Sequence, residues 1–191
     1  MFQKNELREK SLKMREEAAK SDDGMAAGIV ASKVIMLPEL DQVRPVAGYI
    51  PIKNELDCLI ILKALHAAFF PIALPSIVAK GQALDFRVWG METELIDGPF
   101  GTKQPTEARV TPEIVLVPLV AFDLKGGRIG YGGGFYDRTI KGLKENNMCL
   151  VTIGVAYEAQ QLDDIPMEAH DQHLDMVITE KQIHRFSDLE S

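Results

Sequence analysis

Alternating apolar and polar stretches divide the chain into helices and strands. Residues 3–20 are good helix formers without Gly or Pro, and SDDG at 21–24 ends this run and can cap a second helix over about 25–36. Short alternating pieces within 81–112 predict a hairpin and an excursion loop. The remaining runs predict strands at 43–51, 71–78, 114–123, 149–157 and 175–179, and helices at 54–70, with Asn54 as a cap, and at 135–146.

Strands that alternate with helices predict an α/β fold, a three-layer α/β/α sandwich with a largely parallel central sheet. The chain has 191 residues, of which 46% are hydrophobic and 26% charged, which is typical of a globular protein with one sizeable core. No internal repeat or linker interrupts it, so we expect a single domain over residues 1–191.

The charge balance argues against a nucleic-acid partner. A formal net charge of −7 does not provide the basic face that displaces counterions from a duplex. The longest apolar stretch is interrupted by His66, Pro71 and Pro75, so no membrane span is expected. The two cysteines, Cys58 and Cys149, lie far apart without metal-ligand spacing, which favours a reducing, cytoplasmic setting. No obligate protein partner is evident.

The stretch GGRIGYGGGFYDRTI at 126–140 has six glycines in its first nine positions. A strand that runs into a glycine loop and a helix start presents free N–H groups to an anion. Neither the P-loop nor the Rossmann fingerprint fits, and a tight turn at Lys125-Gly126-Gly127 explains part of the cluster equally well. The flanking residues favour a phosphate site: Arg128 can bind phosphate oxygens, Tyr136 offers a hydroxyl, and Asp137 a carboxylate for Mg²⁺.

Three cations share one face of the first predicted helix. At ~100° per residue, Lys4, Arg8 and Arg15 fall within about 40° of one another. A stripe of this kind is usually solvated surface, which is the interpretation for Arg15.

Other polar and aromatic residues suggest structural roles. On its apolar helix His66 is interpreted as a partnered core residue, and Trp89 and Phe86 as core of a strand. The HDQHLD cluster at 170–175 superficially suggests a transition-metal site, which the few histidines of the chain disfavour.

The pattern R-x-G-x-G-x-G-F-Y-D-R at 128–138 resembles the signature of 5-formyltetrahydrofolate cyclo-ligases. Phe135 replaces the commoner tyrosine of that signature, and Gly133 stands where some relatives have lysine. Further family features extend the resemblance over nearly the whole chain: KNELR at 4–8, GYIPIKNELD at 48–57, LP at 74–75, GPFGTKQP at 98–105 and HDQHLDMVITE at 170–180.

The resemblance implies a fold similar to phosphosugar isomerases and CoA transferases. It also implies an enzyme that closes 5-formyltetrahydrofolate to 5,10-methenyltetrahydrofolate with ATP as co-substrate and Mg²⁺ as cofactor. In that reaction ATP phosphorylates the formyl oxygen, N10 attacks, and phosphate departs. Positioning and charge neutralisation carry most of such a phosphoryl transfer.

The family motifs map onto specific residues. The implied catalytic residues are Arg128, Tyr136 and Asp137. The implied ATP-binding residues are Lys4, Arg8, Arg128, Gly130, Gly132, Gly133, Gly134 and Tyr136. The implied folate-binding residues are Ile50, Glu55, Phe100 and Tyr136, and the implied Mg²⁺ ligands are Asp137 and Asp171.

Two other functions are compatible with the residues alone. A phosphosugar isomerase on the same architecture would use Glu55 as a base and the glycine loop for the sugar phosphate, without consuming ATP. A non-catalytic folate- or nucleotide-binding module would retain the pocket but not the transfer chemistry.

Overall fold

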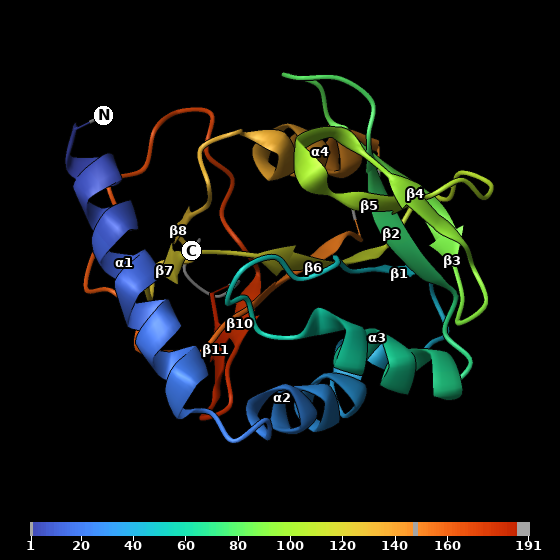
Figure 1. Cartoon of the computed structure of the whole chain (residues 1–191), viewed down its shortest axis with the longest axis horizontal. Helices are drawn as coiled ribbons and strands as arrows, with labels where there is room; N and C mark the ends of the chain where they lie inside the picture. Colours follow the sequence, from blue (N-terminus) through green and yellow to red (C-terminus); the bar gives the residue numbers. More distant parts are fainter. Residues whose placement is uncertain (1, 147–148, 187–191) are drawn as a thin grey trace.

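The computed structural model describes residues 2–146 and 149–186, which build a seven-stranded sheet flanked by helices (Figure 1). The helices are α1 (Phe2–Ser21), α2 (Ala26–Ile35), α3 (Cys58–Ala67) and α4 (Phe135–Asn146), with short 3-10 turns η1 (Pro38–Leu40), η2 (Pro99–Gly101) and η3 (Glu158–Gln160). The strands are β1 (Val46–Ala47), β2 (Ile72–Ile77), β3 (Leu84–Trp89), β4 (Leu95–Asp97), β5 (Lys103–Pro105), β6 (Ile114–Pro118), β7 (Ala121–Phe122), β8 (Arg128–Ile129), β9 (Val151–Val155), β10 (Met176–Ile178) and β11 (Ile183–Arg185).

The central sheet has the strand order β11-β10-β9-β6-β1-β2-β3. The five inner strands pair in parallel, and the edge strands β11 and β3 pair antiparallel to their neighbours. The predicted largely parallel sheet is therefore confirmed.

Helices cover both faces of this sheet, which explains its apolar strands. Side chains alternate between faces along a strand: Val46 and Leu116 join α2 and α3 in one buried cluster, whereas Ala47 and Val117 join Ile140 of α4 in another. Figure 1 shows the same arrangement, with α2 and α3 below the sheet and α4 above it. The α/β fold class with this layering is confirmed.

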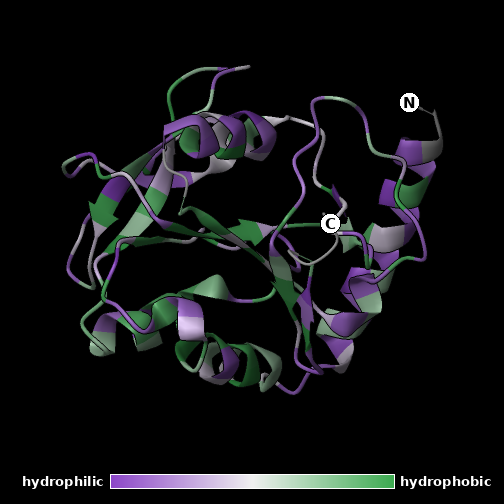
Figure 2. Ribbon diagram, turned by 180° about the vertical axis from the view of Figure 1, so that it is seen from behind, coloured by the Kyte–Doolittle hydropathy of each residue, from purple (hydrophilic) through white to green (hydrophobic). Residues whose placement is uncertain are grey.

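Helix α1 lies at the side of the sandwich rather than on a face of the sheet (Figure 1). It packs Leu7 and Leu12 against a small cluster that includes Ala121 of β7 and Ile129 of β8. Figure 2 shows α1 as largely hydrophilic and the central strands as hydrophobic. A helix with so little apolar surface is held in place by its polar contacts as well as by packing.

Several element boundaries differ from the prediction. Asn54 does not cap α3, because the chain stays irregular until Asp57, whose carboxylate accepts a hydrogen bond of 2.9 Å from the Leu59 amide. The strand expected at 43–51 contracts to β1, because the chain leaves the sheet after Ala47. The strand expected at 114–123 is divided into β6 and β7.

The segment after β2 contains both the strand and the hairpin that its alternation suggests. β3 pairs with β2 at the edge of the sheet, and β4 pairs with β5 as a separate two-stranded hairpin. Trp89 and Phe86 are buried as predicted, on opposite faces of the sheet. The prediction for His66 is wrong, because its position on α3 faces solvent. Within the described residues, no helix combines the length and apolarity needed to cross a bilayer.

Candidate active site

The first two glycines of the glycine-rich stretch form a tight turn. β7 and β8 are antiparallel, and the buried carboxylate of Asp123 closes their connection by accepting bonds from the amides of Lys125 (2.9 Å) and Gly127 (2.8 Å). Gly126 has a φ of +81°, which favours glycine. The turn predicted at 125–127 is confirmed, so Gly126 and Gly127 have a structural role in the turn between β7 and β8.

The remaining glycines form a loop of residues 130–134 that leads into α4, which we call the glycine loop. Gly132 and Gly134 have φ values of +89° and +64°, so the loop conformation requires glycine at these positions. A Cβ placed on Gly130 would meet no atom within 4 Å, so the backbone there faces open space. Because α4 begins directly after the loop, its unpaired N–H groups give this region an affinity for anions.

Two of the predicted cations on α1 contact the glycine loop or its surroundings. Arg8 donates through Nε to the carbonyl oxygen of Gly130 at 2.7 Å, and its guanidinium lies 3.5 Å from the position of a Cβ on Gly132. Lys4 forms an ion pair with Asp171. The fold thus brings together residues that are more than 120 positions apart in the sequence.

Arg128, in β8, connects the first turn of α4 to the segment 168–172. Its side chain is buried and donates to Asp137 Oδ1 at 2.6 Å and to the carbonyl oxygen of Gln172. The Gln172 amide donates to the same Oδ1 at 3.1 Å. Asp137, in the first turn of α4, is therefore fixed by two donors, and the one from Arg128 is a charge-assisted hydrogen bond.

Asp171 lies next to this network. Its Oδ2 accepts a hydrogen bond of 2.7 Å from the Glu168 amide and pairs with Lys4. Burial opposes ionisation of Asp171, but the hydrogen bonds from Lys4 and from the Glu168 amide outweigh it and hold its pKa below the ordinary value. Asp171 is consequently a carboxylate at neutral pH.

Two of the residues predicted to bind folate, Ile50 and Glu55, lie in the irregular segment between β1 and α3. Ile50 packs against the core on the α2 and α3 side of the sheet, after the carboxyl end of β1. Glu55 is nearly buried, and its Oε2 accepts a hydrogen bond of 2.9 Å from the Ile52 amide. Burial raises the pKa of Glu55, and the Ile52 amide and the Arg15 charge partly offset this shift.

Aromatic side chains extend this region toward α4. Phe100 has a φ of +61°, is 68% exposed, and meets the ring of Phe135 edge-on at 6.1 Å between centroids. Burial raises the pKa of Tyr136 well above its ordinary value, and the charge of Glu55 adds to the shift. The Tyr136 hydroxyl therefore stays protonated at neutral pH and can donate a hydrogen bond.

The interpretation of Arg15 as solvated surface is wrong. Its side chain is 2% exposed, with Nη1 at 3.8 Å from Glu55 Oε1 and Nη2 donating to the Tyr131 hydroxyl at 2.5 Å. The prediction missed both Arg15 and Tyr131 as neighbours of Glu55. A signal was present, because Arg15 shares the helix face of Lys4 and Arg8.

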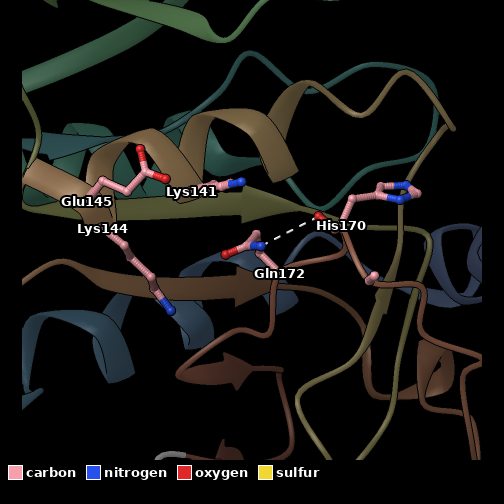
Figure 3. A pocket seen from close by; sticks show the side chains of 6 residues that line it. Lys141, Lys144, Glu145, His170 and Gln172 are labelled. Carbon is pink, nitrogen blue, oxygen red and sulfur yellow. Dashed lines mark hydrogen bonds between the residues drawn. The ribbon is translucent and has the colours of Figure 1, made fainter.

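A cavity of about 560 Å³ lies beside the segment 168–172. Figure 3 shows side chains of α4 on one side and of the segment 168–172 on the other, with Gln172 donating to the His170 carbonyl oxygen at 3.5 Å. The main-chain N–H of Gln172 donates to Asp137, so the cavity borders the candidate site. The sequence did not predict it. Its lining residues are Lys141, Lys144, Glu145, Ala169, His170 and Gln172.

Comparisons with known proteins identify the family of the chain. A family model described as the 5-formyltetrahydrofolate cyclo-ligase family matches residues 1–180. The chain is 29% identical over 176 residues to the 5-formyltetrahydrofolate cyclo-ligase of Haemophilus influenzae, covering 88% of this chain and 92% of the relative. It is 31% identical over 150 residues to the Mycolicibacterium smegmatis cyclo-ligase, covering 73% and 75%.

A solved structure also matches the chain. The NMR structure of Aquifex aeolicus 5,10-methenyltetrahydrofolate synthetase matches with a TM-score of 0.81 at 31% identity, covering 98% of this chain and 95% of that chain. The resemblance inferred from the glycine-rich motif is confirmed, and with it the prediction of a ligase enzyme. The chain belongs to the 5-formyltetrahydrofolate cyclo-ligase family.

Proposed function

We propose that this enzyme converts 5-formyltetrahydrofolate to 5,10-methenyltetrahydrofolate with ATP and Mg²⁺, releasing ADP and phosphate. The observation that carries the proposal is the convergence of Lys4, Arg8 and the Arg128–Asp137 pair around the glycine loop. A protein that bound folate alone would have no use for this set of cations and carboxylates beside an anion-binding loop.

The glycine loop and α1 are proposed to hold the ATP phosphates. Open backbone at Gly130 and the start of α4 offer N–H donors, and Arg8 lies against the loop with Lys4 close by. Arg128 is proposed to act by holding Asp137 in place, because its two terminal nitrogens already donate to the Gln172 carbonyl oxygen and to Asp137. In phosphoryl transfer, such fixed charges lower the barrier by stabilising charge on the transferred group.

Two carboxylates fit a magnesium ion in this proposal. Both hydrogen bonds that the described residues donate to Asp137 use Oδ1, which leaves Oδ2 for a cation. Asp171 lies in the segment 168–172, whose Gln172 main-chain amide donates one of these bonds. Among the residues that the structure describes, no three His, Cys, Asp or Glu side chains converge on a metal-sized site. Mg²⁺ requires only one or two carboxylates when phosphate supplies the other oxygens, and it neutralises phosphate charge when bound.

The folate is proposed to lie against Ile50, Glu55 and Phe100. The Glu55 carboxylate can accept hydrogen bonds from the amide and amine donors of the pterin, and Phe100 offers an exposed ring beside the start of α4. The formyl oxygen takes the γ-phosphoryl group from ATP, N10 attacks the formyl carbon and releases its proton to solvent, and the C–O bond breaks with release of phosphate. The protonated Tyr136 hydroxyl can donate to an oxygen in this step.

The direct test follows the methenyl chromophore in the near ultraviolet after 5-formyltetrahydrofolate is mixed with the purified protein. We expect absorbance to rise only when ATP and Mg²⁺ are both present, and ADP to form in equal amount. Omission of each component in turn is the control. Equal turnover without nucleotide would overturn the proposal.

Asp137→Asn tests the chemistry of the site. The substitution removes the charge while an amide oxygen can still accept from Arg128, so we expect a folded protein that binds folate and loses at least about 100-fold in kcat, the scale of a lost transition-state stabiliser. Asp164→Asn, which breaks an exposed ion pair with Lys125, is the matched control. Unchanged rates of Asp137→Asn across a Mg²⁺ titration would remove Asp137 from the mechanism.

A further inference from the structure

We infer that Arg15 is a positioning residue, which orients the Glu55 carboxylate for the folate and ties it to the glycine loop through Tyr131. The inference rests on the proposed function, because it takes Glu55 as a folate contact. It assigns to α1 a second task beyond its phosphate-facing cations Lys4 and Arg8.

The geometry places Arg15 between the two halves of the site. Its Nη1 lies 3.8 Å from Glu55 Oε1 and donates to the carbonyl oxygen of Leu119 at 3.2 Å. Its Nη2 donates to the Tyr131 hydroxyl, and Tyr131 belongs to the glycine loop. One side chain of α1 thus contacts the folate-side carboxylate and the nucleotide-side loop.

Burial of the Arg15 and Glu55 charges costs solvation free energy, which calls for a functional reason to keep them there. The side chains of Arg15 and Glu55 are 2% and 4% exposed, and Arg15 Nε has no hydrogen-bond partner within the described part of the chain. Burying an ion pair rarely gains stability over an apolar pair of similar volume. An incompletely satisfied arginine at this position is therefore better explained by a requirement for its charge next to Glu55 than by stability.

Tyr131 completes the link. Its ring lies beneath two cations, with the Arg15 guanidinium carbon at 5.5 Å and Lys53 Nζ at 4.9 Å from the centroid. Lys53 precedes Glu55 by two residues, so the ring joins α1, the glycine loop and the folate-side segment. Both Lys53 and Tyr131 favour the charged form of Glu55, as Arg15 does.

The test compares Arg15→Met and Arg15→Lys with Lys13→Met, which removes a charge from an exposed position of the same helix. We expect Arg15→Met to raise the folate KM about tenfold, the effect of the lost ion pair with Glu55, and to change the ATP KM less than about twofold. Arg15→Lys should recover part of this loss, and Lys13→Met should match the wild type. Equal increases in both KM values would overturn the inference.

A double-substitution cycle separates positioning from a merely structural role. If Arg15 acts through Glu55, Arg15→Met should add less than about twofold to the folate KM when Glu55→Gln is already present. Full additivity would overturn the inference. Should Arg15→Met alone not fold, the double variant, which leaves no unpaired charge, and Tyr131→Phe decide the question: Tyr131→Phe is expected to raise the folate KM about threefold, and an unchanged value counts against the link.

The same measurements distinguish this inference from the proposed function. An unchanged folate KM for Glu55→Gln would show that the folate site itself is misplaced. A raised folate KM for Glu55→Gln together with an unchanged one for Arg15→Met would reject the role of Arg15 alone.

Discussion

The two ends of the basic stripe on α1, which consists of Lys4, Arg8 and Arg15, carry the same charge but have different environments in the structure. Near the N-terminus, Lys4 and Arg8 are partly exposed and contact Asp171 and the Gly130 carbonyl oxygen. Two turns further on, Arg15 is buried against Glu55 and Tyr131. One helix therefore leaves its first two cations partly exposed and holds the third inside the protein.

Because of this difference, we expect substitutions at the two ends of the stripe to have different effects on ligand binding and on stability. The side chains of the Lys4–Asp171 pair are 14% and 10% exposed, so water reaches this pair more than the Arg15–Glu55 pair and its loss should cost less stability. Removing one partner of a buried pair leaves an unpaired charge in a medium of low polarity, which costs several kilocalories per mole. Substitutions at the N-terminal end should mainly affect ligand binding, and those at Arg15 should affect both.

The largest effect is expected for Arg15→Ala. It opens a cavity and leaves Glu55 buried without its cation, so we expect a loss of about 3 kcal/mol in the free energy of unfolding, measured by urea denaturation. Lys13→Ala on the exposed face is the control and should stay within about 0.5 kcal/mol of the wild type. A loss below about 1 kcal/mol for Arg15→Ala would erase the contrast between the two ends of the stripe.

The sequence predicted the parts of the molecule that are determined by local pattern. Apolar runs identified β2 and β6, because strands covered on both faces need apolar side chains throughout. The glycine-rich motif, with the resemblance it carries, identified residues that the fold brings together: Arg128 with Asp137, and Lys4 with Asp171.

What the sequence did not predict depends on contacts between distant segments. A helical pattern shows that Arg15 shares a face with Arg8, but not that Tyr131 and Glu55 cover that part of the face. The cap of α3 was assigned to Asn54 instead of Asp57 because both are good caps, and the turn that delays the helix lies in an irregular segment. The cavity beside α4 likewise forms only when the segment 168–172 folds against the helix.

A smaller effect is expected for Asp171→Asn. The asparagine oxygen can keep the bond from the Glu168 amide but loses the ion pair with Lys4, so about 1 kcal/mol of stability should be lost at neutral pH. Because the folded-state pKa of Asp171 is held below its unfolded value, this contribution is fully present above the unfolded pKa, about 4, and disappears as pH falls through the folded pKa.

The measurement is urea unfolding of wild type and Asp171→Asn from pH 7 to pH 3. The two stability curves should converge toward acid. A difference that stays constant over this range would show that the Lys4–Asp171 contact does not depend on the Asp171 charge.

The smallest change in stability is expected at Arg8. Its partly exposed side chain donates to the Gly130 carbonyl oxygen and to Asn5, whose amide oxygen lies 2.5 Å from Arg8 Nη1, so Arg8→Ala should cost less than about 0.5 kcal/mol. The ATP KM should nevertheless rise about tenfold with the folate KM nearly unchanged, because a single phosphate contact is worth about 1.4 kcal/mol. Lys10→Ala, exposed on the same helix, is the control and should leave both constants unchanged. If Arg8→Ala instead lowered stability as much as Arg15→Ala and left the ATP KM unchanged, the N-terminal end of α1 would serve the fold and not the nucleotide, and the distinction between the two ends of the stripe would be lost.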